Sequence, residues 1–543
     1  MVNEWDESYD FVIVGSGAGM SAALVAKTMG KRALIIEKTD KVGGSTALSG
    51  GVMWVPNNPV SLRAGVPDSM EQARAYLDAC IGDSAPKYSG PRKEAYLVEG
   101  PKAIAFFESL GMKFVHAEGY SCYHENEKPG GMARSRSIEA EIFDLNELGE
   151  WEPHLRRRPV FIPVHMHEVH YVGIMGRTLA SKYHTAKVGL RLLRNKMGAK
   201  LAGMGLALQG RMLQLVLKHN IDIWRESPVT DFVVNEGRVV GVAVQRNGKP
   251  IRVQARSGVL VDAGGFSRNL DMRQKFGPQP ASVDWTNSNP GDTGEMIGRM
   301  VELGAALGNM DQAVWTPVSL MPDGNRGIHP GDMSKPYCIM VNEKGERFVN
   351  ESTSYMSLGQ AMYRQKVPAW YVMDNRFRRY RWAGYPAGEP PAAWLASGYM
   401  KKGNTVEELA KQCGIDSAAL RSTVDRFNEF ARTGDDQDFN RGKSAYNRFW
   451  GDVTVKPNPN LGSIEQGPFY AVQAFPGDVG TFGGALVDEF SRVLKDDGTP
   501  IPGLYATGNA TASFTGASYP GAGASIGPAY VFGYVAARHA LSA

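Results

Sequence analysis

A tyrosine stands among glycines close to the C-terminus, in the stretch SYPGAGASIGPAYVFGY of residues 518–534. Gly521, Gly523 and Gly527 have no Cβ atom, so their backbone can come close to a ligand. Tyr519 is bulky, and its phenol can donate a hydrogen bond. Two interpretations follow: Tyr519 packs in a core, or its hydroxyl points at a ligand. Most tyrosines are packing residues, so the rest of the chain has to decide.

A second glycine-rich stretch, GSGAGM, lies near the N-terminus after the apolar run FVIV. The run is typical of a buried parallel strand, the residues after the glycines have helical spacing, and ALIIEK predicts the next strand. This is the context of a dinucleotide-binding fingerprint. Gly15 would make the tight turn, and Gly17 would let a pyrophosphate approach the backbone. The helix that follows would supply N–H groups to it.

The fingerprint is imperfect, because Met20 stands where its third glycine is expected. Glu37 lies about 20 residues beyond the turn, where an acidic side chain binds ribose hydroxyls. On these residues alone, an ordinary βαβ turn stays an alternative.

Three further segments of small residues make an ordinary βαβ turn the weaker interpretation. VGGSTALSGGVMW follows Glu37 closely, and DAGGF and GLYATGNAT each come after a strand-like run. Separated segments that meet at one ligand suit FAD better than NAD, because FAD is long. We therefore predict FAD as the cofactor. The predicted cofactor contacts are Gly15, Gly17, Ala18, Glu37, Lys38, Gly44, Ser45, Thr46, Ser49, Gly50, Gly51, Ala263, Gly264, Gly508, Asn509, Ser525 and Ile526.

Four motifs together carry a family resemblance: DFVIVGSGAG, EKTDKVGGSTALSGG, GLYATGNATAS and YPGAGASIGPAYVFGY. They resemble the flavoprotein family of fumarate reductases and 3-ketosteroid dehydrogenases, and most closely its 3-ketosteroid Δ1-dehydrogenases. The resemblance covers nearly the whole chain. It implies an α/β fold in which a Rossmann-type FAD-binding domain, at residues 1–287 and 481–543, holds an inserted α+β catalytic domain at 288–480. Within the inserted domain, Thr405 to Ala431 predicts two amphipathic helices.

The same resemblance implies a catalytic set of three tyrosines and a glycine. Tyr519 and Gly523 fit the family's Y-P-G-x-G motif, and Tyr355 follows a strand and turn in the inserted domain. Tyr123 fits the loop tyrosine, with Tyr120 as the alternative.

The implied reaction desaturates a 3-ketosteroid between C1 and C2, by loss of a proton from C2 and of a hydride from C1 to flavin N5. Tyr519 O–H and Gly523 N–H would bind the ketone oxygen as an oxyanion hole. Tyr355 would be the base, and Tyr123 would stabilise its phenolate or relay the proton.

Three alternatives remain open. One is a 3-ketosteroid Δ4-(5α)-dehydrogenase, which acts at C4–C5. Another is a fumarate-reductase-like enzyme, which needs Arg or His groups to bind a dicarboxylate. Arg177 could be such a group, so this alternative is not excluded. The last is a flavin-binding module without catalysis, which a ketosteroid would not reduce.

Three histidines crowd together in HMHEVHY, at His165, His167 and His170. No carboxylate or cysteine cluster in the sequence completes a metal site, so we predict a structural role and no metal. The four cysteines are far apart without a CxxC motif, which predicts reduced thiols in a cytoplasmic protein. The net charge of +4 and the lack of basic blocks give no reason to expect nucleic acid as a partner. The N-terminus has no secretory signal pattern.

A stretch from Val169 to Ile221 has no acidic residue and nine basic ones, with leucines and methionines between them. A basic, apolar helical segment is typical of a membrane surface, so residues 182–218 suggest peripheral contact with the inner membrane surface. The equal alternative is a helix packed on the FAD-binding domain. The electron acceptor, a quinone or a protein, is not identified by the sequence.

Overall fold

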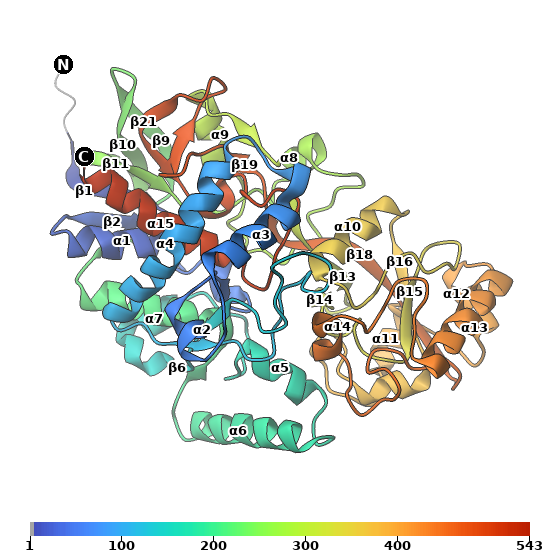
Figure 1. Ribbon diagram of the computed structural model, residues 1–543. Coiled ribbons are helices and arrows are strands. Elements are labelled where there is room, and N and C mark those ends of the chain that lie inside the picture. The colour runs from blue at the N-terminus through green and yellow to red at the C-terminus, as the bar shows by residue number, and fades with distance from the viewer. Residues whose placement is uncertain (1–4, 543) are drawn as a thin grey trace.

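The computed structural model describes residues 5–542. Two separate large β-sheets organise this part of the chain, one on each side of the molecule in Figure 1. Strands from both ends of the chain, at residues 7–261 and 492–506, form the first sheet. Strands from the middle, at residues 313–481, form the second. The α/β class predicted from the sequence is confirmed.

The first sheet has the strand order β20-β21-β11-β1-β2-β8, and β10 and β9 extend it from β11. β1 lies parallel to both β11 and β2, so the glycine turn after β1 opens at the same edge as the ends of its neighbours. The strands are β1 (Glu7–Val14), β2 (Ala33–Ile36), β8 (Asp222–Trp224), β9 (Val229–Asn235), β10 (Arg238–Arg246), β11 (Lys249–Val261), β20 (Arg492–Leu494) and β21 (Pro500–Ala506).

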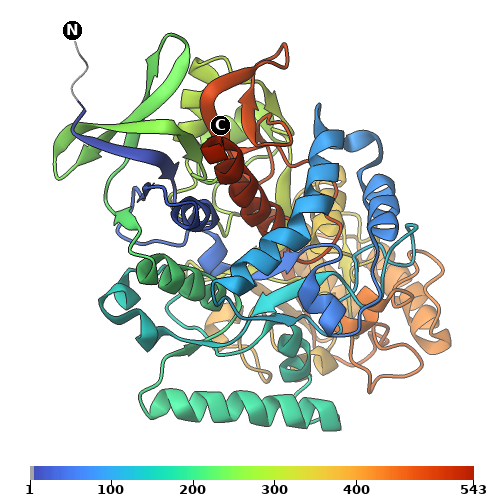
Figure 2. The same cartoon turned by 60° about the vertical axis from the view of Figure 1, so that its left-hand side comes forward.

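Helices cover one face of this sheet. Figure 2 shows the first and last helices of the chain side by side there. Met20, which replaces the third fingerprint glycine, is fully buried in this core. Gly533 permits the close helix contact instead, since a Cβ atom there would lie 2.5 Å from the Ser21 hydroxyl. The covering helices are α1 (Gly19–Thr28), α4 (Ser89–Ser109), α7 (Met204–Lys218) and α15 (Ile526–Ser542).

The second sheet has the order β14-β13-β18-β16-β15, with β17 beside β18. Its strands are β13 (Ala313–Leu320), β14 (Arg326–Ile328), β15 (Cys338–Val341), β16 (Ala369–Met373), β17 (Met400–Gly403) and β18 (Phe469–Thr481). The helices around it are α10 (Tyr355–Arg364), α11 (Ala392–Ala396), α12 (Val406–Cys413), α13 (Ser417–Thr433) and α14 (Ala445–Trp450). The two amphipathic helices predicted for Thr405 to Ala431 are α12 and α13, so that prediction is confirmed.

Smaller elements connect the two sheets. The strands are β3 (Val52–Trp54), β4 (Phe114–His116), β5 (Ser137–Ala140), β6 (Phe143–Asp144), β7 (Leu201–Ala202), β12 (Leu307–Gly308) and β19 (Gly484–Ala485). The helices are α2 (Pro59–Arg63), α3 (Met70–Ile81), α5 (Met166–Gly173), α6 (Leu179–Lys196), α8 (Leu270–Phe276) and α9 (Glu295–Glu302).

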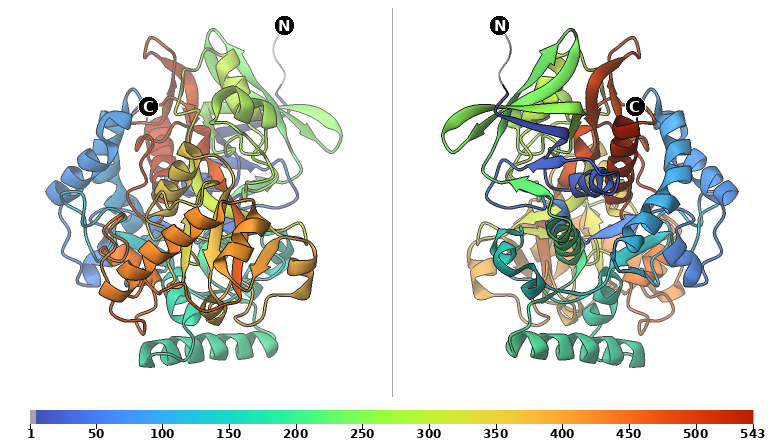
Figure 3. Two further views of the ribbon diagram at one scale, coloured as in Figure 1. Left: turned by 90° about the vertical axis from the view of Figure 1, so that its right-hand side faces the viewer. Right: turned by 90° about the vertical axis from the view of Figure 1, so that its left-hand side faces the viewer.

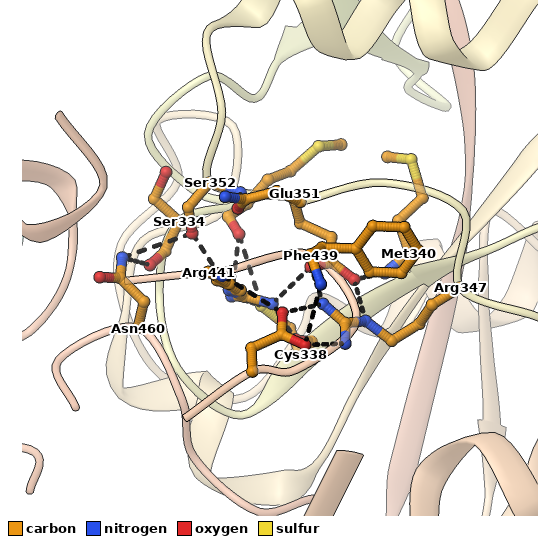
Figure 4. Close-up of polar contacts among 12 residues, drawn as sticks. Ser334, Cys338, Met340, Arg347, Glu351, Ser352, Phe439, Arg441 and Asn460 are labelled. Carbon is orange, nitrogen blue, oxygen red and sulfur yellow. Dashed lines mark hydrogen bonds and ion pairs between the residues drawn. The ribbon is translucent and has the colours of Figure 1, made fainter. Parts of the chain in front are cut away.

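A buried ion network holds the segment that leads into α10 (Figure 4). The guanidinium of Arg441 is fully buried and donates to the Glu351 carboxylate at 3.0 Å and to the Ser352 hydroxyl at 3.0 Å. Arg347 binds the same carboxylate at 2.8 Å. Because charges out of water need complete partners, this network fixes the backbone just before Tyr355.

The basic segment at 182–218 does not form one surface. Its first half belongs to α6, which lies along the lower edge of the molecule in Figure 3. Its second half forms α7, whose residues Leu206, Leu208 and Met212 are buried in the core. The α7 half of the segment is therefore not available for membrane contact, because its apolar residues are covered by protein. Among the described residues, no helix combines the length and the apolar character needed to cross a membrane.

Candidate active site

A cavity of about 440 Å³ opens at the edge of the first sheet where β1, β2 and β11 end. Its wall contains every residue predicted for the cofactor except Gly50 and Gly51. At Gly51, which has φ +67°, a Cβ atom would collide with the backbone of Met204 and Gly205. Glycine there allows the loop to pack against the start of α7, which explains its place in the motif without a ligand contact.

The turn after β1 has the geometry that a dinucleotide needs. Gly15 has φ +107°, and a Cβ atom there would collide with the Asp262 carbonyl. α1 begins at Gly19 and points its N-terminus into this region, where its N–H groups favour an anion. Sequence reasoning predicted this turn correctly, because its residues are contiguous.

Glu37, the predicted ribose ligand, lies at the end of β2 on the cavity wall. Its carboxylate accepts hydrogen bonds from the Ser16 hydroxyl at 2.6 Å and from the Thr39 hydroxyl at 2.9 Å. These two bonds hold the side chain in place. Lys38 beside it donates to Thr293 at 2.7 Å and pairs with Glu295 at 3.1 Å.

The loop that holds Ser45 faces two polar residues that the sequence did not reveal. Ser45 donates to the Asp292 carboxylate at 2.9 Å, and Asn289 donates to the Ser45 hydroxyl at 2.9 Å. Burial raises the pKa of Asp292 to about 6, although Ser45 and Asn289 lower it. Arg156 and Arg158 also line the cavity. These residues lack a local motif, so only the folded chain identifies them.

Three predicted tyrosines meet beside this cavity. The ring centres of Tyr123 and Tyr355 lie 5.6 Å apart, those of Tyr355 and Tyr519 also 5.6 Å, and those of Tyr123 and Tyr519 5.9 Å. Tyr519 Oη lies 3.0 Å from the hydroxyl of Ser525, which lines the cavity. The phenol cluster and the predicted cofactor site therefore share a wall.

Loop pairing brings the tyrosines together. Cys122 forms a β-bridge with Gly521, and the N–H of Tyr123 donates to the Pro520 carbonyl at 3.0 Å. Tyr355 is the first residue of α10, and Gln360 of that helix donates to the Ala517 carbonyl at 2.8 Å. Residues from three distant parts of the chain are thus fixed around the loop of Tyr519.

Gly523 adopts φ +93°, and a Cβ atom there would collide with the Val52 carbonyl. Only glycine fits this position. Its N–H and that of Ser525 both lie close enough to lower the pKa of Tyr519, against a larger upward effect of burial. The hydroxyl of Tyr519 and the N–H of Gly523 are thus neighbouring donors, as an oxyanion hole requires.

Burial raises the pKa of all three phenols above the ordinary value for tyrosine. For Tyr355, a hydrogen bond with Tyr123 works against that rise. Tyr355 also stands at the N-terminus of α10, where the helix dipole favours negative charge. The pKa of Tyr355 is nevertheless raised further than that of Tyr519, so the feature that favours Tyr355 as the base is its place at the N-terminus of α10.

Tyr446 of α14 is a fourth member of the cluster, and its ring centre lies 4.7 Å from that of Tyr123. No local pattern in the sequence marks this residue. Tyr120, the alternative to Tyr123, packs instead against Phe449 with ring centres 4.9 Å apart. The structure therefore places Tyr123, and not Tyr120, with Tyr355 and Tyr519.

The three histidines of HMHEVHY lie at the start of α5 and within it. Glu139 lies within ligand distance of His165 and His167, so the carboxylate missing from the sequence pattern is supplied by β5. That carboxylate accepts the N–H of His167 at 3.0 Å and bonds its Nδ1 at 2.8 Å. Glu139 thus caps the first turn of α5.

The chain matches the family model described as FAD binding domain over residues 10–526. It is 39% identical to 3-oxosteroid 1-dehydrogenase of Mycolicibacterium smegmatis over 98% of this chain and 97% of that protein. It is 36% identical to 4-oxocyclohex-2-ene-1-carboxylate 5-dehydrogenase of Sinomonas cyclohexanicum over 97% of this chain and 93% of that protein.

A solved structure is also similar. The crystal structure of 3-ketosteroid delta1-dehydrogenase from Sterolibacterium denitrificans, in complex with 1,4-androstadiene-3,17-dione, has a TM-score of 0.92 and 34% identity. The match covers 99% of this chain and 100% of that one.

Proposed function

Because the chain belongs to the FAD-binding flavoprotein family that includes 3-oxosteroid 1-dehydrogenases, we propose that it desaturates 3-ketosteroids between C1 and C2. The observation that carries the proposal is the convergence of Tyr123, Tyr355 and Tyr519 with Gly523 beside the cofactor cavity. Three phenols in an apolar environment suit a ketone substrate, whose reaction needs hydrogen-bond donors and a base.

Tyr519 and Gly523 polarise the ketone. In the proposed complex, the Tyr519 O–H and the Gly523 N–H donate to the C3 oxygen, where negative charge grows as the C2 proton leaves. Donors fixed in a buried site need no reorganisation, and each is worth about 3 kcal/mol in the transition state. The polarised carbonyl makes the C2–H bond acidic.

Tyr355 takes the C2 proton. Its hydroxyl needs to be ionised or to pass its own proton on, and Tyr123 is the neighbour that can accept or stabilise that charge. Tyr446 lies on the far side of Tyr123 and extends the chain of phenols. The two hydrogens have different acceptors: Tyr355 accepts the C2 proton, and FAD, when bound, would supply the acceptor for the C1 hydride.

The residues around the cavity fit FAD. The glycine turn, the N-terminus of α1 and the acid at the end of β2 match the needs of the pyrophosphate and the ribose. The loops at Ser45, Gly508 and Ser525 extend the wall over a length that suits a dinucleotide. We propose the division of the chain at about 287/288 and 480/481, which separates the two large sheets apart from the last residue of β18.

The test is anaerobic mixing of the purified yellow protein with 4-androstene-3,17-dione while flavin absorbance is followed. Bleaching with a 1,4-diene product, identified by mass spectrometry and NMR, supports the proposal. A protein that holds FAD but does not bleach overturns it for this substrate. Saturated 3-ketosteroids then test desaturation at C4–C5, and dicarboxylates test fumarate-type chemistry. A module without catalysis would stay oxidised with all of them.

Arg177 does not favour the dicarboxylate alternative. Its guanidinium pairs with the buried Asp452 carboxylate and lies 4.8 Å from the ring centre of Tyr380. An arginine neutralised by a buried aspartate is a poor clamp for a second carboxylate.

We further propose that α6 contacts the membrane surface. Leu179, Tyr183, Ala186, Leu190, Leu193 and Met197 repeat every three or four residues, so they form one stripe along the helix. The stripe faces solvent: Leu179 is 85% exposed, Leu190 64% and Met197 75%. Lys182, Arg194 and Lys196 are exposed beside it, which suits anionic headgroups. Sterols dissolve in membranes, so this contact would bring the enzyme to its substrate.

Vesicle flotation tests this contact. The wild type is expected to float with phosphatidylglycerol vesicles, and Leu190→Glu with Leu193→Glu is expected to remain in the soluble fraction. Leu270→Glu, at another exposed leucine, is the matched control and should still float. A wild type that ignores the vesicles contradicts the contact. A wild type that dimerises through α6, without vesicle binding, shows that a second copy covers the stripe.

A further inference from the structure

A buried carboxylate lies at the N-terminus of α1, inside the predicted cofactor cavity. Asp262 follows the end of β11, and its Oδ2 accepts the N–H of Gly19 at 2.6 Å. A Cβ atom at Gly17 would lie 3.1 Å from Oδ2, and one at Gly508 would lie 2.9 Å from Oδ1. The carboxylate is thus held between two of the loops that line the cavity.

This is the position where the dinucleotide fingerprint directs a pyrophosphate. The N–H groups of the first turn of α1 attract an anion, and one of them is already bonded to Asp262. An ionised Asp262 would therefore compete with the pyrophosphate for the same donors. It would also repel the negative charge of the pyrophosphate at short range.

The surroundings give Asp262 no compensating cation. Within residues 5–542 its carboxylate takes part in no ion pair, and the charged side chains that raise its pKa are the acids Glu37 and Asp292. Tyr530 of α15 also faces it, with a phenol that burial keeps protonated because it raises the pKa. Lys38 is engaged by Glu295.

Burial, helped by the charges of Glu37 and Asp292, raises the pKa of Asp262 to about 7. The N–H groups of Gly19 and Ala18 lower it but do not cancel these effects. The carboxyl group therefore changes its charge within the neutral range, before any ligand adds its own negative charge.

We propose that FAD binding is linked to proton uptake by Asp262: the cofactor binds when this carboxyl group is neutral, and the ionised form competes with the pyrophosphate for the N-terminus of α1. A protonated Asp262 also gains an O–H donor, which can bind a phosphate oxygen. The proposal rests on the FAD site of the family and not on the substrate. It therefore survives or fails independently of steroid desaturation.

The linkage between proton uptake and FAD binding determines how strongly the dissociation constant of FAD should depend on pH. If one proton is taken up, the dissociation constant of FAD rises by up to about tenfold per pH unit above the pKa of Asp262. Asp262→Asn keeps the shape and an acceptor for the Gly19 N–H but has no charge to lose. Its dissociation constant should stay nearly constant over the same range, and FAD should bind it more tightly than the wild type at alkaline pH.

The experiment titrates deflavinated full-length protein with FAD and follows flavin fluorescence between about pH 6 and pH 9 at fixed ionic strength. Asp292→Asn is the matched control: its carboxyl group lines the same cavity, and loss of its charge lowers the pKa of Asp262, so the variant should keep the wild-type slope at alkaline pH with the onset at a lower pH. A flat wild-type profile, or an equal slope in Asp262→Asn, overturns the proposal.

A second measurement does not depend on the variant. Calorimetric titration of the wild type with FAD in buffers of different ionisation enthalpy gives the number of protons taken up. The expected value approaches one proton per FAD at about one pH unit above the pKa of Asp262. Uptake of no proton there contradicts the proposal, even if Asp262→Asn does not fold.

Discussion

Replacement of Tyr519 by phenylalanine removes one oxygen atom from the centre of the tyrosine cluster. The ring is 4% exposed and is packed by Tyr123, Tyr355 and Phe482, all within 5.9 Å between ring centres. Phenylalanine keeps those contacts. The hydroxyl that is lost lies 3.0 Å from the Ser525 hydroxyl, its hydrogen-bond partner. The variant should therefore fold, with a stability loss of about 1 kcal/mol.

The effect on the reaction should be much larger than the effect on stability. Loss of one oxyanion donor costs about 3 kcal/mol in the transition state, which corresponds to a factor of about 10²–10³ in rate. The Gly523 N–H remains as the second donor, so activity should not vanish. Because the donor acts on charge that develops during the reaction, kcat should fall and KM should change little.

Anaerobic stopped-flow reduction of the flavin by 4-androstene-3,17-dione measures this rate directly. Tyr505→Phe is the matched control, since Tyr505 Oη lies 3.0 Å from Nδ1 of His539 and the residue belongs to β21, outside the tyrosine cluster. Its reduction rate should equal that of the wild type. If Tyr519→Phe reduces its flavin within a few-fold of the wild-type rate, Tyr519 does not polarise the ketone.

Three further predictions follow from the site and its support. With FAD saturating, the reduction rate should rise with pH through the alkaline range, because burial raises the pKa of the Tyr355 base; a rate independent of pH in the same stopped-flow assay contradicts this role. Tyr446→Phe should lower that rate by about tenfold and alter its pH profile, whereas an unchanged profile would make Tyr446 a packing residue. Glu351→Gln should lower the free energy of unfolding by about 3–5 kcal/mol in denaturant titrations near neutral pH, because it leaves buried arginines without their carboxylate. Burial alone raises the pKa of Glu351, but the two guanidinium groups hold it below the ordinary value. The stability that the ionised carboxylate contributes is therefore present above the unfolded-state pKa and is lost as the pH falls through the folded-state pKa. Glu351→Gln should lose less of its free energy of unfolding in acid than the wild type does, and an equal loss in the two proteins would refute the linkage.

Features that depend on residues close together in the sequence could be predicted from it. The turn after β1 and the Y-P-G-x-G loop depend on glycines at fixed spacing, because a positive φ or a close backbone approach excludes side chains whatever the distant fold. The apolar runs and helical spacing around the first turn predicted the strand, helix and strand that hold it. A resemblance based on these motifs was enough to indicate the family.

Other features depended on distant segments. Tyr446 joins Tyr123 because α14 packs against the loop at 120–123, and no local pattern marks it. The fates of α6 and α7 also differ although both are basic and apolar, since burial depends on what the rest of the chain places beside a helix. Asp262 follows an ordinary strand in the sequence, and only parallel pairing of β11 with β1 brings its carboxylate to the N-terminus of α1. Spacing along a chain fixes local backbone geometry, whereas the charge, burial and neighbours of a side chain are decided by tertiary packing.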